Sequence, residues 1–155
     1  MANVRGFSIM PTAKELLTEK EAKGVITVRA ELSVQDACKL MHTHRVGCLV
    51  VTGGGQTIEG IFTERDVVNR LVAEDKDASD TKVGELMTRE VIVVEPDRPF
   101  EEIEAIMKQN RIRHLPVAGD RELLGLLSIG DVMAHDASKN KQMVHYLTEY
   151  IYGRH

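Results

Sequence analysis

The alternation of apolar and polar positions predicts five elements in the first half of the chain. Apolar runs at residues 25–28, 48–51 and 60–63 are short and nearly continuous, as expected of strands in a sheet that is covered on both faces. Between the first two runs, apolar residues recur at helical spacing after Ser33, a residue suited to cap a helix N-terminus. A second helix is expected from residue 64 to about residue 73. The unit therefore reads β-α-β-β-α.

The second half of the chain repeats this order of elements. The run VITV at 25–28 recurs as VIVV at 91–94, and after a one-residue gap in the hairpin Gly60 aligns with Gly125. A unit of about 50 residues buries too little surface to be stable alone. The predicted fold class is therefore α/β (α+β), with two pseudo-twofold-related β-α-β-β-α repeats that pack sheet to sheet around a shared core.

Polar segments and helical patterns outside the repeats predict the remaining organisation. The expected parts are residues 1–23 (an N-terminal segment with a helix from Thr12 to about Ala22), 24–74 (first repeat), 75–82 (polar linker), 83–135 (second repeat) and 136–155 (a C-terminal helix).

The C-terminal helix, expected from about Ser138 to Tyr152, carries an apolar stripe longer than a monomer usually leaves exposed. The stripe consists of Met143, Tyr146, Leu147, Tyr150 and Ile151. We expect it to pack against the repeats or against a second subunit.

The composition excludes several classes of protein. The chain has 155 residues, of which 43% are hydrophobic and 28% charged, so it can bury a core and is not expected to be disordered. Its net charge of -4 argues against a nucleic-acid partner, which requires a basic surface. The sequence has no apolar stretch suited to a membrane span and no signal-peptide pattern, so we expect a cytoplasmic protein without a membrane partner. Cys38 and Cys48 are expected to be small buried thiols.

One strand-turn-helix motif ends both repeats, as GIFTERD at 60–66 and as GLLSIGD at 125–131. In each motif a hydroxyl residue precedes an acid by three positions, which is the spacing of a helix capping box. The residues are Thr63 and Asp66 in the first repeat, and Ser128 and Asp131 in the second. The same spacing suits a ligand, because helix N-terminal amides favour a phosphate and a carboxylate can accept from a ribose diol. Both interpretations are open on these residues alone.

The two motifs in register resemble those of a tandem CBS-domain pair, the Bateman module. In that family the motif is Gly, hydrophobic, variable, Thr or Ser, two variable residues and Asp, and RHLPV at 113–117 resembles a second family motif. The resemblance covers residues 24–135. It implies a regulatory module, of the kind found in stand-alone bacterial proteins, rather than an enzyme. It also implies an adenosine-containing ligand (AMP, ADP, ATP, S-adenosylmethionine or NAD(H)) in clefts between the repeats, with no metal required. A homodimer and an effector protein are the implied partners.

The resemblance also assigns roles to individual residues. It implies that each motif acid holds a ribose, that Arg113 serves the Asp66 site, and that Arg65 serves the Asp131 site. His114 is left open between a ligand contact and a histidine satisfied by backbone. The complete candidate set is Thr27, Thr63, Arg65, Asp66, Val93, Arg113, His114, Pro116, Ser128 and Asp131, in which Thr27 and Val93 would line the adenine through their backbone.

The two candidate sites are not equivalent, because the RHLPV strand of the second repeat corresponds to GCLVV in the first, without the basic residues and the proline. We therefore expect uneven occupancy. The leading hypothesis is a homodimeric sensor of adenine nucleotides that signals to a partner protein. The alternative is a purely structural dimerisation scaffold whose motif acids are caps. A nucleotide-processing enzyme has little support, since only Glu64 and His114 are available as a base.

Overall fold

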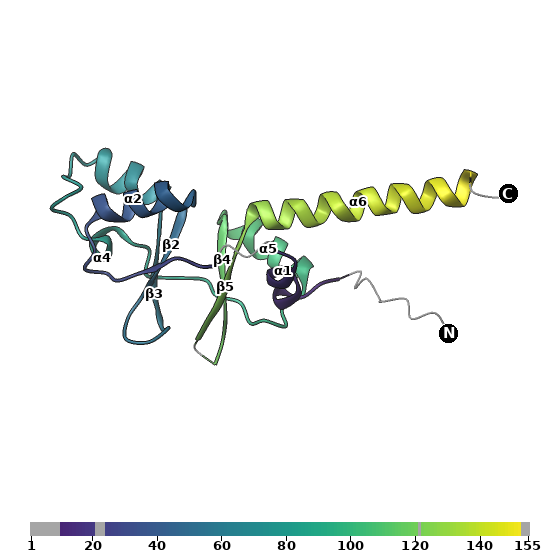
Figure 1. The fold of residues 1–155 in the computed structure, drawn as a ribbon, viewed down its shortest axis with the longest axis horizontal. Coiled ribbons are helices and arrows are strands. Elements are labelled where there is room, and N and C mark those ends of the chain that lie inside the picture. Colours follow the sequence, from purple (N-terminus) through teal and green to yellow (C-terminus); the bar gives the residue numbers. More distant parts are fainter. Residues whose placement is uncertain (1–9, 21–23, 121, 153–155) are drawn as a thin grey trace.

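The structure is a computed structural model that describes residues 10–20, 24–120 and 122–152 (Figure 1). In chain order the elements are α1 (Ala13–Glu19), β1 (Thr27–Val28), α2 (Val34–His44), β2 (Cys48–Thr52), β3 (Ile58–Thr63), α3 (Glu64–Asp66), the π-helical η1 (Val67–Val72), α4 (Val83–Leu86), α5 (Phe100–Asn110), β4 (His114–Gly119), β5 (Glu122–Ser128) and α6 (Ile129–Tyr152). The predicted mixed α/β fold with two similar repeats and flanking helices is confirmed.

The first repeat contains the predicted strand-helix-strand-strand-helix order. Its sheet has the order β1-β2-β3, in which β1 pairs parallel with β2 and β2 pairs antiparallel with β3. All five residues of β2 are buried, which explains why CLVVT lacks polar alternation. Helix α2 begins after Ser33, whose Oγ accepts a hydrogen bond from the Asp36 amide at 3.1 Å.

The second repeat has one strand fewer than predicted. Residues 91–94 do not form a strand, and only Val94 makes a parallel bridge, with Val117. In the first repeat the Val50 amide donates to the Ile26 carbonyl at 3.1 Å. The residue that corresponds to Val50 is Pro116, which has no N–H to donate, so the pairing cannot extend toward residue 92.

The two short helices that precede the repeats are exchanged between them. Ala13 and Leu16 of α1 belong to the core of the second repeat, whereas Val83 and Leu86 of α4 belong to the core of the first. In Figure 1, α1 accordingly lies beside α5 and β5, and α4 lies below α2. Buried side chains thus form two clusters, each completed by the helix that precedes the other repeat. The expectation of one shared core is therefore wrong.

The motif glycines are the contact points for the exchanged segments. A Cβ atom on Gly60 would lie 2.6 Å from Met87 Sδ and 2.9 Å from the Thr88 carbonyl oxygen, and one on Gly125 would lie 2.6 Å from Leu17 Cδ2. Only glycine lets each segment approach the strand this closely. The segments after α4 and in α1 therefore cover equivalent strands, β3 and β5.

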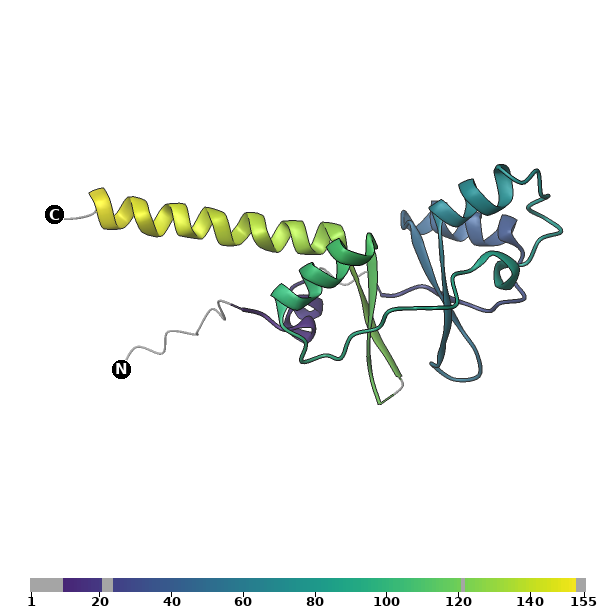
Figure 2. The same ribbon diagram turned by 180° about the vertical axis from the view of Figure 1, so that it is seen from behind.

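Helix α6 is continuous where two helices were expected. The join, around residues 136–141, contains no glycine or proline, so nothing interrupts the helical hydrogen bonds. Beyond the second repeat the helix projects away from the body of the molecule (Figures 1 and 2). Met143 is 53% and Leu147 is 46% exposed, so the stripe does not pack against the repeats there. The side chains of Tyr146, Tyr150 and Ile151 lie outside the described residues.

Candidate functional site

A cleft of about 1100 Å³ lies where the two repeats meet. The first repeat contributes the ends of α2 and β3 and the residues of α3 and η1. The second contributes residues 111–114, at the end of α5 and the start of β4, together with Ser128 and Ile129. Two backbone hydrogen bonds place these segments, from the Glu64 amide to the Gly47 carbonyl at 3.1 Å and from the Ile129 amide to the Arg113 carbonyl at 2.8 Å.

Asp66 lines this cleft and also caps its own helix. Its Oδ2 accepts from the Thr63 amide at 2.8 Å and from Thr63 Oγ1 at 3.2 Å, and the residue is 7% exposed. Its Oδ1 lies 3.7 Å from Nη1 of Arg70, which also donates to the Leu86 carbonyl at 2.8 Å. One carboxylate oxygen therefore fixes the helix start, and the other, Oδ1, makes only the long contact with Arg70 among the residues that the structure describes.

The cleft concentrates positive charge in a protein whose net charge is -4. Five arginines line it (Arg45, Arg65, Arg70, Arg111 and Arg113), against three acids (Glu64, Asp66 and Glu90). Arginine binds phosphate oxygens in a bidentate manner and stays charged at all physiological pH values. The cleft is therefore suited to an anionic ligand.

Two of these arginines occupy strained backbone positions. Arg45 ends α2 with φ of 54° and Arg111 ends α5 with φ of 53°, both in the left-handed region. Glycine or asparagine is usual at such a helix end, and other residues cost about 1–2 kcal/mol there. An arginine in this strained conformation thus ends the helix at the equivalent position of both repeats, and both arginines line the cleft.

His114 lies at the start of β4, with the cationic Arg113 beside it. Burial, followed by the positive charge of Arg113, lowers the pKa of His114 from its usual value, and Lys20 acts in the same direction. The carboxylates of Glu64 and Asp131 oppose this shift in the pKa. The imidazole is therefore neutral at pH 7, and a phosphate bound nearby would favour its protonated form.

The depressed pKa of His114 predicts a pH-dependent stability. Between the lowered folded pKa and the unfolded value of about 6.5, the unfolded chain binds more protons, so the free energy of unfolding falls as the pH drops through that window. Urea denaturation at pH values from 5 to 8 measures this slope. His114→Asn should flatten it, whereas His44→Asn, an exposed control, should not. An unchanged slope in the His114 variant would contradict the assignment.

Neither cysteine of the first repeat is a reactive thiolate at neutral pH. Burial, followed by the negative charge of Asp66, raises the pKa of Cys48 to about 12. Burial also raises the pKa of Cys38, which lines the cleft and is half-buried. Both are free, so the cysteines supply packing in this region rather than nucleophilic chemistry.

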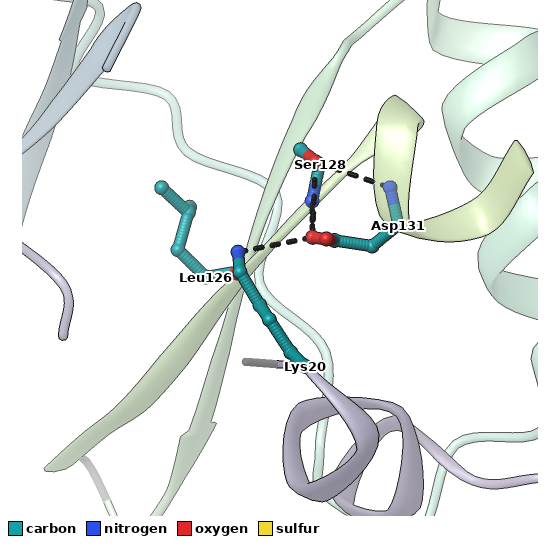
Figure 3. A network of polar contacts seen from close by, with 4 residues as sticks. All are labelled: Lys20, Leu126, Ser128 and Asp131. Atoms are coloured by element: carbon teal, nitrogen blue, oxygen red, sulfur yellow. Dashed lines mark hydrogen bonds and ion pairs between the residues drawn. The ribbon is translucent and has the colours of Figure 1, made fainter. Parts of the chain in front are cut away.

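Asp131 is held differently from Asp66, by a cation from outside its repeat (Figure 3). Its Oδ2 accepts from the Ser128 amide at 2.7 Å, from Ser128 Oγ at 2.9 Å and from Lys20 Nζ at 3.0 Å. The same Nζ donates to the Leu126 carbonyl at 2.9 Å. Lys20 directly follows α1, so the N-terminal segment reaches the acid of the second motif.

The structure brings together six of the ten candidate residues. Those that line the cleft are Thr63, Arg65, Asp66, Arg113, His114 and Ser128. The other four are not among the lining residues: Thr27 pairs with Val50 in the sheet, Val93 is 40% exposed, Pro116 is buried in β4, and Asp131 is paired with Lys20. Arg65, assigned to the Asp131 site, lies in the same cleft as Asp66.

Sequence reasoning missed several residues of the site. Arg45 and Arg111 occupy equivalent positions of the two repeats, and Arg70 lies one helical turn after Asp66, but none of the three belongs to a motif that indicates a ligand contact. Lys20 gave no signal, because 111 residues separate it from Asp131.

Within residues 10–20, 24–120 and 122–152, no three histidine, cysteine or acidic side chains lie close enough together to hold a metal ion. In that same part of the chain, no helix combines the length and apolar character needed to cross a membrane.

Two similar repeats around a common cleft define a tandem-repeat module, and comparison with known families identifies it. The model of the CBS domain matches residues 14–73 and 83–138, and the first match begins within α1. The chain belongs to the CBS-domain family, as a CBS domain pair.

Curated relatives support this assignment. The mitochondrial CBS domain-containing protein CBSX3 of Arabidopsis thaliana is 38% identical over 125 residues, which cover 78% of this chain and 61% of that protein. YhcV, a CBS domain-containing protein of Bacillus subtilis, is 31% identical over 129 residues, covering 83% of this chain and 88% of the relative. The chain thus spans less than two thirds of the Arabidopsis protein.

Solved structures share the fold. A putative signal-transduction protein with CBS domains from Burkholderia ambifaria superimposes with a TM-score of 0.78 at 38% identity, covering 82% of this chain and 94% of that one. The CBS domain pair of MJ0100, in complex with 5'-methylthioadenosine and S-adenosyl-L-methionine, gives a TM-score of 0.74 at 25% identity, with coverages of 84% and 98%. A hexameric CBS-CP12 protein from bloom-forming cyanobacteria gives 0.69 at 31% identity, with coverages of 79% and 70%.

Proposed function

We propose that this CBS pair is a regulatory sensor of adenine nucleotides, such as AMP, ADP, ATP or NAD(H), which bind in the cleft beside Asp66. The observation that carries the proposal is the convergence of a ribose-competent carboxylate and five arginines on one cleft of about 1100 Å³. Ligand pockets for small molecules typically have volumes of about 300–1000 Å³, so the cleft has room for a nucleotide.

The chemistry divides the ligand between the two repeats. Asp66 Oδ1, opposite the oxygen that caps the helix, would accept from the ribose hydroxyls. Arg113 and His114, from the second repeat, would face the phosphates, with Arg45 and Arg111 adding positive charge at the helix ends. A ligand that contacts both repeats stabilises the arrangement of the repeats in which Asp66 reaches the ribose while Arg113 and His114 reach the phosphates. The coupling free energy available for signalling is typically about 1–3 kcal/mol.

The type of ligand follows from the charge of the cleft. MJ0100, whose CBS pair has a similar fold, binds two adenosine compounds, one of them a sulfonium cation. Five guanidinium groups against three carboxylates favour phosphates in this chain instead. We infer that affinity increases with the number of phosphates.

The partners are a second copy of the chain and an effector protein. Val68 of η1 and Met133 of α6 are exposed apolar side chains at equivalent positions of the two repeats. Val72 of η1 is exposed as well, and Met143 and Leu147 continue the exposed surface along α6. Such surface is typical of an interface. The CBS-CP12 protein of similar fold is hexameric, so an assembly larger than a dimer is the alternative. Light scattering of the purified protein, which measures its molar mass, distinguishes the two.

A structural scaffold without ligand is the second candidate. The observation in its favour is that Asp66 and Asp131 both accept hydrogen bonds from their own motif amides, as helix caps do. The two candidates predict different results in a single titration experiment.

Calorimetric titration with adenosine, AMP, ADP, ATP, NADH and S-adenosylmethionine tests the proposed function. We expect binding of the phosphorylated ligands, tightening from AMP to ATP and weakening with added salt, and weak binding of adenosine. Inorganic triphosphate serves as the control for charge alone and should bind more weakly than ATP. Flat titrations with every ligand would instead favour the scaffold.

A further inference from the structure

Backbone groups of β3 and β5 make their hydrogen bonds with different partners in the two repeats. In the first repeat, the Thr88 amide donates to the Ile61 carbonyl at 2.8 Å and the Ile61 amide donates to the Thr88 carbonyl at 3.0 Å. Leu126 occupies the position of Ile61 in the second repeat, and its carbonyl accepts from Lys20 Nζ at 2.9 Å. A side-chain ammonium therefore takes the place of a backbone amide.

The same ammonium pairs with the motif acid. Lys20 Nζ lies 3.0 Å from Asp131 Oδ2, and the two side chains are 27% and 21% exposed (Figure 3). Counting from the exchanged helices, with Leu16 matched to Leu86, the residue that corresponds to Lys20 is Glu90, which lines the cleft. The two residues at this equivalent position after the exchanged helices, Lys20 and Glu90, therefore carry opposite charges.

We propose that Lys20 occupies the second nucleotide site, so that the unliganded chain presents one open cleft, at Asp66, and one closed site, at Asp131. This inference rests on the proposed function. A ribose entering the second site needs the Asp131 carboxylate, which the Lys20 ammonium already engages. The ligand must displace an ammonium that makes two hydrogen bonds, both within 3.0 Å.

Displacing Lys20 also loosens the N-terminal helix. Lys20 is the residue that ends α1, and α1 covers β5 through Leu17 and enters the second core through Leu16. Occupation of the second site and docking of α1 are therefore coupled, with Lys20 as the residue that links them. At the first site the link to the exchanged helix is looser, because Arg70 donates to the Leu86 and Met87 carbonyls at 2.8 and 3.2 Å but lies 3.7 Å from the Asp66 carboxylate.

The number of ATP molecules bound per chain tests the inference. Calorimetry should give one ATP for the wild-type chain and two for Lys20→Met, which retains the lysine stem without its charge. Adding Asp131→Ala to Lys20→Met should return the value to one. Lys14→Ala, a charge removal at an exposed position on the same helix, is the matched control and should leave it at one. Circular dichroism checks the fold, and Lys20→Gln replaces the methionine variant if that variant does not fold.

Each result has a defined meaning. Two ATP per wild-type chain, or one per chain in the folded Lys20 variant, overturns the inference and leaves the proposed function standing. The absence of ATP binding in both chains overturns the proposed function and this inference with it. An increase from one to two on loss of the Lys20 charge supports both.

Discussion

Asp66→Ala should lower the affinity for ATP by about 100-fold, because hydrogen bonds to a charged group contribute about 1.5–3 kcal/mol and each 1.4 kcal/mol is a factor of ten. The carboxylate has two tasks in the structure, and the substitution removes both. Its Oδ2 holds the Thr63 amide at 2.8 Å, so the free energy of unfolding should also fall, by about 1 kcal/mol for a lost cap. Calorimetry measures the first effect and urea denaturation the second.

The two effects are separated by a control that removes only a cap. Glu85 Oε2 accepts from the Lys82 amide at the start of α4, and this exposed residue does not line the cleft. Glu85→Ala should cost a similar amount of stability and leave ATP affinity unchanged. If Asp66→Ala binds ATP like the parent, the acid is a cap alone and the proposed ribose contact is wrong.

The second large effect is expected from Leu16→Ala, at a position outside the predicted repeats. Leu16 is 4% exposed and packs in the core of the second repeat, so its truncation should lower the free energy of unfolding by about 2–5 kcal/mol. Because total stability is about 5–15 kcal/mol for a typical protein, such a loss is a large fraction of it. Chemical denaturation measures this change.

Hydrogen exchange shows where the loss falls. Since α1 completes the second core, amides of β4 and β5 should lose protection in Leu16→Ala, and those of β2 and β3 should keep more of theirs. Leu124→Ala on β5 is the control, because Leu124 is exposed and its truncation should change stability by about 0.5 kcal/mol or less. Equal loss of protection in both repeats would contradict the exchanged-helix description.

Local chemistry made most of the elements predictable. Helix α2 starts after Ser33 and the motif acids cap their helices, as the spacing in the sequence indicated. The predicted strand at 91–94 was wrong because the missing donor belongs to Pro116, on another segment. The break expected within α6 was wrong because a polar stretch without glycine or proline continues a helix.

The candidate site was only partly predictable. The motif residues Thr63 and Asp66, with Arg113 and His114, lie along one cleft. Arg45, Arg70 and Arg111 could not be assigned to it from the sequence, because the direction of a surface arginine depends on which segments lie opposite. Their backbone positions at the ends of α2 and α5 became informative only with the left-handed φ values.

The sequence by itself determined the duplication, the mixed α/β class, the order of elements in the first repeat and the two hydroxyl-acid pairs that begin helices. These features depend on periodicity and on contacts between residues a few positions apart. Only the tertiary structure decided that α1 and α4 change places, that five arginines share one cleft, and that Lys20 reaches Asp131 across 111 residues. Such pairings depend on which buried faces meet when the chain packs. The repeated sequence pattern does not indicate which of the two preceding helices, α1 or α4, covers the strands of which repeat.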